Sequence, residues 1–207
     1  MPIVKHGKPN IIGTHEREQP RDLAGLLAEL EHESPIARRW AARDLAEHEE
    51  SSEALIARLA READPSVRDA ILTALTYQGN TTAVLGLVEC LRSEDAGLRN
   101  EAIEAMKRLP EAVAPIMNSL LVDQDSDVRI FAVNILESLC HPQVETWLIG
   151  VIEQDDHINV CATAVDLLGE VGTLASQSAL IHLKAKFPDE PYICFAVDLA
   201  LKRISGD

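Results

Sequence analysis

The sequence predicts an all-α protein built as a row of about six stacked helix pairs, and three observations support this. A pattern of about 31 residues recurs along the chain, and each copy has the apolar spacing of two amphipathic helices. Aromatic residues make up only 3% of the chain although 46% of it is hydrophobic. A core of Ala, Leu, Ile and Val suits close helix-on-helix packing, and stacked neighbours would cover the apolar face of each pair.

The repeat is clearest from Asp64 to Leu75, and its pattern returns at residues 95–106 and 125–136. An aliphatic residue, followed by Arg in four of the six copies, marks the same phase each time. The intervals between successive markers are 30, 31, 30, 32 and 33 residues. The six markers are Ala37, Val67, Leu98, Val128, Val160 and Ile193.

The markers divide the chain into an N-terminal arm or cap, residues 1–20, and a solenoid over residues 21–207. In the second helix of each unit, apolar residues at the marker and four, eight and eleven positions later form one stripe, as in Val67, Ile71 and Leu75. The expected units span about 22–50, 51–80, 81–110, 111–141, 142–173 and 174–207. The expected first helices are 22–32, 52–62, 82–92, 111–122, 143–154 and 175–186.

Helix ends are expected at residues that favour caps and breaks. The proposed first-helix caps are Asp22, Ser52, Thr82 and Ser176. The proposed breaks after second helices are Gly79, Pro110, Pro142 and Gly172.

An Asp recurs before the marker and an Arg recurs directly after it, and we interpret both residues as structural. Asp64, Asp95 and Asp125 lie where a loop enters a helix, so their carboxylates are expected to cap free N–H groups. Arg68, Arg99 and Arg129 follow one turn later and are expected to reach the Asp of a neighbouring unit, which would form a ladder. The alternative, a row of arginines for anionic ligands, is the weaker interpretation because each Arg has an Asp at hand.

These units resemble HEAT repeats, in particular the short HEAT-like variety named after phycobilisome lyases. The D-x-x-V-R-x-x-A pattern and the trailing A-L-G-x-x-G carry the resemblance, and residues 67–79 and 160–172 match best. It covers about residues 22–204 and implies a right-handed α-α superhelix, with second helices on the concave face, that usually serves as a scaffold. Cys161 and Cys194 replace the Arg, so the ladder is in doubt in the last two units.

No residue pattern points to catalysis, a cofactor or a metal. The deoxyhypusine hydroxylases, which resemble this fold and bind two irons, carry His-Glu pairs after the marker, and no unit here has that pair. A metal site from Cys140, His141 and His157 has no spacing signature. Cys161 and Cys194 are expected to be small buried residues without a disulfide. We therefore expect no catalytic residue, no metal and no cofactor.

Charge and hydropathy limit the partners. The net charge is −15, and residues 69–207 hold 9 basic against 21 acidic residues, so nucleic acid is a poor partner. No apolar run approaches the ~18 residues of a membrane span, and the N-terminus lacks a secretory signal. Four cysteines without paired spacing fit a reducing compartment, and we expect a cytoplasmic protein.

The positions two and six past each marker are expected to point into a groove where a protein or peptide partner binds. Ile130, Phe195 and Leu199 are candidate anchors, although Phe195 is equally compatible with packing against the next unit. Arg39 and Arg43 are either a solvated basic face or a site for an acidic segment. The expected partner-binding set is Arg39, Arg43, Thr73, Asn100, Glu104, Ile130, Asn134, Asp166 and Phe195.

Two function classes follow. The first is a non-catalytic protein-binding scaffold or adaptor, with a homo-oligomer through the C-terminal repeat as a further possibility. The second, suggested by the resemblance alone, is a lyase or chaperone for a bilin or other tetrapyrrole. Such a protein needs a roomy pocket with aromatic and acid–base groups, and seven aromatic residues make this the less attractive alternative.

Overall fold

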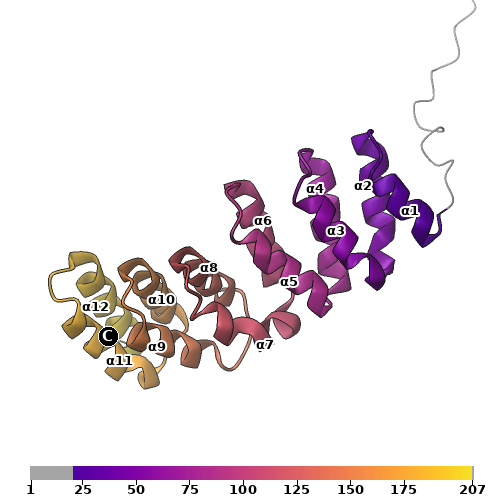
Figure 1. Cartoon of the computed structure of the whole chain (residues 1–207). Helices are drawn as coiled ribbons and strands as arrows, with labels where there is room; N and C mark the ends of the chain where they lie inside the picture. The colour runs from indigo at the N-terminus through magenta and orange to yellow at the C-terminus, as the bar shows by residue number, and fades with distance from the viewer. Residues whose placement is uncertain (1–20, 207) are drawn as a thin grey trace, which may run out of the picture. The chain divides into compact units, whose positions relative to one another are not determined.

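The computed structural model describes residues 21–206, so the expected N-terminal arm, residues 1–20, lies outside the described residues. Over this range the chain forms α-helices joined by short loops and 3-10 turns, without a strand, which confirms the all-α class. The helices belong to two compact bodies. Within the described residues, we call 21–78 the N-terminal body and 79–206 the C-terminal body, and describe each by itself (Figure 1).

The N-terminal body contains two helix pairs. The second helix of each pair packs against the other, and each first helix packs against its own second helix. Leu26, Leu45 and Leu55 are fully buried in this core, as is the marker Val67. The helices are α1 (Leu23–Leu30), α2 (Pro35–Asp44), α3 (Ser52–Leu59) and α4 (Pro65–Gln78), with the 3-10 turns η2 (Leu45–Glu47) and η3 (Glu49–Ser51) between α2 and α3.

The C-terminal body contains four helix pairs in the same order. In Figure 1 the last two pairs lie side by side, and α10 packs against α8, α9 and α12 while α9 packs against α11. The helices are α5 (Thr81–Cys90), α6 (Ala96–Lys107), α7 (Pro110–Leu120), α8 (Ser126–Leu136), α9 (Val144–Gln154), α10 (Ile158–Val171), α11 (Gln177–Lys186) and α12 (Pro191–Ser205), with η4 (Leu174–Ser176) before α11.

The predicted apolar stripe of the second helices is confirmed. Val128, Ala132 and Leu136 on α8 are buried, and so are Val160, Ala164 and Leu168 at the same phase on α10. At about 25 cal/mol for each Å² of apolar surface removed from water, stripes of this kind supply most of the favourable folding free energy. The small residues among them let neighbouring helices approach closely.

The helix starts differ partly from expectation. Asp22 caps α1 by accepting from the Gly25 N–H at 2.8 Å, as predicted. Thr82 is not the cap of α5, because the Asn80 side chain accepts from the Ala83 N–H. Ser52 is the first residue of α3 rather than its cap, since Ser51 occupies the N-cap position. Ser176 occupies the cap position of α11 without a side-chain cap bond.

The helix ends follow the same mixed pattern. Gly79 ends α4 with φ of 55°, a left-handed conformation that favours glycine at a helix terminus. Pro110 is the first residue of α7 rather than the end of α6. That position suits proline because the first N–H of a helix has no intrahelical partner.

The eleventh position of the stripe in the second unit is a glutamine with its own structural role. The Gln78 amide nitrogen donates to the Leu45 and His48 carbonyls at 3.0 and 2.9 Å, and its oxygen accepts from the Ser52 hydroxyl at 2.7 Å. These carbonyls belong to the connection between α2 and α3, where each also accepts from a backbone N–H three residues later, Leu45 from His48 and His48 from Ser51. Gln78 therefore holds this connection in place.

The predicted capping role of the recurring aspartates is confirmed. The Asp64 carboxylate accepts from the Ser66 and Val67 N–H groups, and Asp95 accepts from Gly97 and Leu98. Asp125 accepts from the Asp127 N–H at 2.9 Å. Carboxylates at these helix starts also interact favourably with the helix dipole.

The position after the marker binds the loop that precedes its own helix. Arg38, Arg99 and Arg129 each donate to the carbonyl six residues earlier, at 2.9, 2.6 and 2.7 Å. In the last two units a thiol lies at the same carbonyl. The contacts are Cys161 Sγ to the Asp155 carbonyl at 3.2 Å and Cys194 Sγ to the Pro188 carbonyl at 3.7 Å.

Two of these arginines also reach an acid of the next unit, but it is not the capping aspartate. Arg38 binds both carboxylate oxygens of Glu62, and Arg129 binds both of Asp155. Both acids precede the helix-capping position by two residues. The predicted ladder joined the arginines to the capping aspartates Asp64, Asp95 and Asp125, whereas these two arginines bind Glu62 and Asp155 instead. Arg99 differs again, because its guanidinium carbon lies 5.8 Å from the Phe131 ring centroid.

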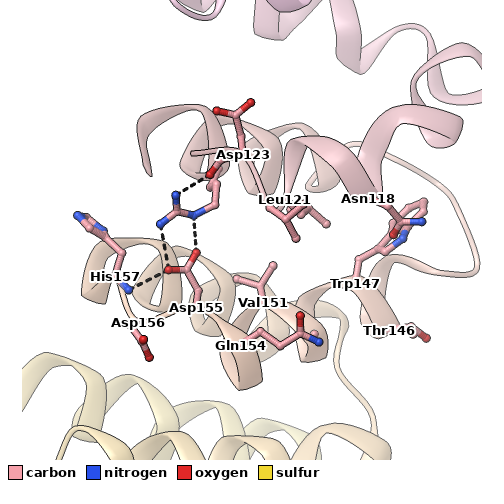
Figure 2. Close-up of a pocket in the computed structure, with 13 residues that line it drawn as sticks. Asn118, Leu121, Asp123, Thr146, Trp147, Val151, Gln154, Asp155, Asp156 and His157 are labelled. Atoms are coloured by element: carbon pink, nitrogen blue, oxygen red, sulfur yellow. Dashed lines mark hydrogen bonds and ion pairs between the residues drawn. The ribbon is translucent and has the colours of Figure 1, made fainter. Parts of the chain in front are cut away.

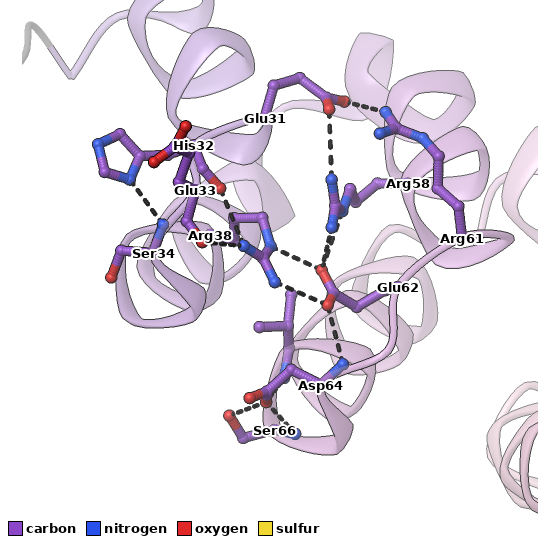
Figure 3. A network of polar contacts seen from close by, with 11 residues as sticks. Glu31, His32, Glu33, Ser34, Arg38, Arg58, Arg61, Glu62, Asp64 and Ser66 are labelled. Atoms are coloured by element: carbon purple, nitrogen blue, oxygen red, sulfur yellow. Dashed lines mark hydrogen bonds and ion pairs between the residues drawn. The ribbon is translucent and has the colours of Figure 1, made fainter.

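Glu62 is the most deeply buried acid of the N-terminal body (Figure 3). Its carboxylate accepts from Arg38, Arg58 and the Asp64 N–H. Burial alone would raise the pKa of Glu62, but the hydrogen bonds from Arg38, the Asp64 N–H and Arg58 lower that pKa to about 2. The acid is therefore ionised at neutral pH and fixes the loop between α3 and α4 against α2.

Candidate protein-binding surface

The second helices of the N-terminal body present the first part of the expected partner-binding set. Arg39 and Arg43 lie on α2 on either side of Trp40 in sequence, with guanidinium carbons 5.9 and 5.2 Å from its ring centroid. Arg43 and Thr73 are exposed, and Arg39 is half-buried. Arginines over an indole ring form a basic surface with restricted side chains.

The C-terminal body carries the rest of the set. Asn100 and Glu104 on α6 are exposed, while Ile130 and Asn134 on α8 are half-buried. Asp166 on α10 and Phe195 on α12 are exposed, and the phenyl group of Phe195 is at 65% relative exposure. Of the two interpretations of Phe195, the structure favours the exposed one for the described chain.

A hollow of about 240 Å³ lies between α8 and α10 and brings Asn134 and Asp166 together. Its floor includes Val133 and Leu167, which are buried. Three carboxylates and no cation are among its lining residues, which are Val133, Asn134, Glu137, Thr163, Asp166, Leu167 and Glu170. The site is therefore a small acidic depression with an apolar base, and we call it the α8–α10 hollow.

An apolar stripe on α12 adjoins this hollow. Tyr192, Phe195 and Leu199 follow one another at three and four positions, so they share one helical face. Their relative exposures are 55%, 65% and 38%. We call these three residues the α12 stripe. Exposed aromatic and aliphatic side chains grouped in this way are typical of interaction sites.

A hydrogen bond joins the stripe to the hollow. The Tyr192 hydroxyl donates to Asp166 Oδ2 at 2.6 Å, and this bond raises the pKa of Tyr192. Asp166 lines the hollow and at the same time anchors the first residue of the stripe. The hollow and the stripe therefore meet at this hydrogen bond.

Tyr192, Thr163 and Glu170 were missing from the predicted set. Thr163 and Glu170 lie three residues before and four residues after Asp166, so helical periodicity from Asp166 could have identified them. Tyr192 directly precedes the marker Ile193, a phase that the predicted set did not include. Nothing in the sequence pattern indicated its bond to Asp166.

A larger hollow of about 880 Å³ lies between the first helices α7 and α9 (Figure 2). Figure 2 shows Trp147 and Thr146 near one end of it and Asp155 and His157 near the other. Two of its carboxylates, Asp123 and Asp155, are held in ion pairs with Arg92 and Arg129. These two carboxylates are therefore already engaged by arginines of the same chain.

The cysteines and histidines of the described chain do not form a metal centre. No group of three or more His, Cys, Asp or Glu side chains within residues 21–206 is arranged to hold a metal ion. All four cysteines are free. His141 stacks on Trp147 with ring centroids 4.9 Å apart, while His157 lies at the far end of the hollow in Figure 2.

None of the helices between residues 21 and 206 combines the length and the apolar character that crossing a membrane requires.

Several solved structures are similar to the chain. The chain is similar to the Drosophila melanogaster Mini spindles TOG3 structure, with 17% identity, a TM-score of 0.56, and coverage of 89% of this chain and 95% of that one. It also matches CpcE and CpcF of phycocyanin lyase from Nostoc sp. PCC7120, with 18% identity, a TM-score of 0.39, and coverage of 98% and 100%. Human deoxyhypusine hydroxylase matches with 16% identity, a TM-score of 0.45, and coverage of 89% and 84%.

The likeness to TOG3 concerns the fold alone. No curated protein matches the sequence. The family profile described as HEAT repeats matches residues 23–107 and 113–192, which is most of the chain and covers the described helices up to the first residues of α12. The repeat phase, the buried stripes and this match agree, and the chain belongs to the HEAT-repeat family.

Proposed function

We propose that the protein is a non-catalytic scaffold that binds another protein through the second-helix face of its C-terminal body. The observation that carries this proposal is the exposed Phe195 side chain on the α12 stripe, which the Tyr192–Asp166 hydrogen bond joins to the α8–α10 hollow. Leaving a phenylalanine side chain in water forfeits about 1.5–3 kcal/mol relative to full burial. A partner that covers the α12 stripe would recover much of that free energy.

The family supports a binding role without naming the partner. A HEAT solenoid presents repeated helix faces, and function on such a fold depends on the side chains placed there. The expected partner-binding residues Asn134, Asp166 and Phe195 lie on or beside the same surface. Arg39, Arg43 and Thr73 belong to the N-terminal body and are proposed as a separate contact region.

The experiment compares three forms of the full chain in affinity capture with chemical cross-linking from its native lysate. The first is the unaltered protein, the second is F195S/L199S, and the third is L174S as a control. Leu174 is as exposed as Phe195 but lies in η4, away from the α12 stripe. We expect a protein that the unaltered chain and L174S capture and that F195S/L199S loses, with all three showing the same helical circular dichroism.

Identical capture by all three forms would overturn the proposal. Light scattering after size-exclusion chromatography tests whether the captured partner is a second copy. Homo-oligomerisation through the C-terminal repeat predicts a dimer that F195S/L199S converts to a monomer.

The tetrapyrrole alternative has one structural observation in its favour, the hollow in Figure 2 with Trp147 and His157 among its lining residues. Two features disfavour it. The Trp147 side chain is largely buried, and Asp123 and Asp155 are engaged with arginines. A bilin or haem titration followed by absorbance separates the two functions, because a spectral shift that saturates at one ligand per chain would favour the tetrapyrrole.

A further inference from the structure

The α12 stripe and the α8–α10 hollow differ in chemistry although one hydrogen bond joins them. The stripe offers two aromatic rings and a leucine to an apolar group of a partner. The hollow offers carboxylates above an apolar floor. A partner that covers both must therefore present two kinds of side chain close together.

The floor and rim of the hollow match the two ends of a long cationic side chain. Val133 and Leu167 form an apolar base that suits the methylene stem of Lys or Arg. Glu137, Asp166 and Glu170 stand around it and accept hydrogen bonds from an ammonium or guanidinium head. Asn134 and Thr163 add neutral acceptors.

The charge of the hollow is only partly balanced within the C-terminal body. Lys107 lies 3.3 Å from Glu137 but also 3.1 Å from Glu104, so one cation is shared between two acids. Asp166 receives its bond from the neutral Tyr192 hydroxyl, which leaves the carboxylate charge in place. A cation from outside would find favourable potential here.

The volume of the α8–α10 hollow limits what can bind in it. About 240 Å³ accommodates a single side chain rather than a helix or a flat ring system, so the rest of the partner must lie over the rim. An apolar neighbour in the same segment would then cover Phe195 and Leu199.

We infer that the partner docks through a basic–apolar segment, with a Lys or Arg side chain in the α8–α10 hollow and an apolar side chain on the α12 stripe. This inference rests on the proposed scaffold function and specifies its partner. The class of partner is a protein with an accessible segment of this composition.

The test uses two synthetic probes and nuclear magnetic resonance titration of the full, isotope-labelled chain. One probe is the peptide Gly-Leu-Arg-Leu-Arg-Leu-Gly with both ends blocked, and the other has both Arg replaced by Glu. We expect the Arg peptide alone to shift the amide signals of Thr163, Asp166, Glu170 and Phe195. We also expect its affinity to fall as salt rises, because the contact is partly electrostatic.

Matched variants test whether the carboxylates of the α8–α10 hollow bind the Arg peptide. D166N/E170Q removes two carboxylates from the hollow, and E111Q/E153Q removes two exposed ones from the first helices α7 and α9. We expect D166N/E170Q to weaken binding of the Arg peptide about tenfold and the control to change it less than about twofold. Equal binding of the Glu peptide, or equal weakening by both variants, would overturn the inference.

The two proposals fail separately. If capture from lysate depends on Phe195 while the peptides show no preference for Arg, the protein is a scaffold with a different partner chemistry. If the Arg peptide binds the hollow but no protein is captured through Phe195, the site recognises cations and the scaffold function is wrong.

Discussion

Arg38 donates to the two carboxylate oxygens of Glu62 at 2.7 and 2.8 Å, and this pair lies almost entirely out of water (Figure 3). R38M leaves the buried Glu62 carboxylate with Arg58 but without its two-bond partner, whereas R38M/E62M removes that carboxylate and leaves Arg58 to its contact with Glu31. We expect R38M to destabilise the N-terminal body by about 2 kcal/mol, because Arg58 still compensates part of the Glu62 charge, and R38M/E62M to recover part of the loss.

The measurement is urea unfolding followed by Trp40 fluorescence in a W147F background, since the two tryptophans lie in different bodies. R61A serves as the control because Arg61 pairs with Glu31 at the surface and should change stability by less than about 1 kcal/mol. A double variant no more stable than R38M would contradict the prediction.

The same acid predicts how the N-terminal body responds to low pH. The folded-state pKa of Glu62 is lowered from 4.5 to about 2, so its contribution is present above pH 4.5 and is lost as the pH falls toward 2. The total contribution is about 3 kcal/mol, at about 1.4 kcal/mol for each pKa unit. We expect the unfolding free energy of E62Q to be lower at pH 7 but to fall less steeply between pH 5 and pH 3. Parallel slopes would show that Glu62 does not titrate in this way.

The hydrogen bonds of Gln78 predict that an apolar residue at this position lowers the stability of the N-terminal body. Leucine at this position would continue the buried stripe, yet it would remove the Gln78 hydrogen bonds to the Leu45 and His48 carbonyls and from the Ser52 hydroxyl. We expect Q78L to cost about 2 kcal/mol, because three hydrogen bonds that each contribute about 0.5–1.5 kcal/mol are lost and the added apolar contact offsets only part of that loss. Y77A on the same helix is the control, since Tyr77 is exposed and should matter by about 0.5 kcal/mol or less.

Much of the fold could be predicted from the sequence because one physical constraint repeats. Each unit must bury an apolar stripe against its neighbours, so markers such as Val128 and Val160 give the number of helix pairs directly. The capping aspartates were equally accessible, because Asp95 can satisfy free N–H groups within its own turn. Contacts of this kind depend on residues only a few positions apart.

Contacts between units could not be predicted in the same way. Arg129 has Asp125 one turn away in sequence, but its partner is Asp155, which the loop between α9 and α10 places beside it. The Tyr192–Asp166 bond likewise depends on how α12 is placed against α10. The depth of the α8–α10 hollow depends on the packing of both helices, which periodicity alone does not specify.

The partner of Arg129 can be tested by double-mutant cycles. We expect a coupling free energy of about 1–3 kcal/mol between R129L and D155N, since Arg129 and Asp155 form a largely buried two-bond pair. Between R129L and D125N we expect less than about 0.5 kcal/mol. Unfolding is followed by Trp147 fluorescence in a W40F background. A larger coupling to Asp125 would restore the simple ladder that the sequence suggested.

The cysteines test whether the thiol has replaced the arginine as a buried structural group. Burial raises the pKa of Cys161 and of Cys90 to about 11, whereas Cys140 is exposed. A pKa raised by two from the ordinary 9.0 means roughly a hundredfold less thiolate at pH 8, and burial blocks the reagent as well. Cys194 is half-buried, so the test uses a C194S background. There we expect one fast reaction with a disulfide reagent such as Ellman's reagent, which C140S abolishes, and much slower labelling of Cys161 that accelerates in mild urea as the helices open. Because the Cys161 thiol lies 3.2 Å from the Asp155 carbonyl, the acceleration should coincide with loss of the Trp147 signal of the C-terminal body. Rapid labelling of Cys161 in the folded protein would mean that this loop opens without unfolding and that the thiol does not hold it.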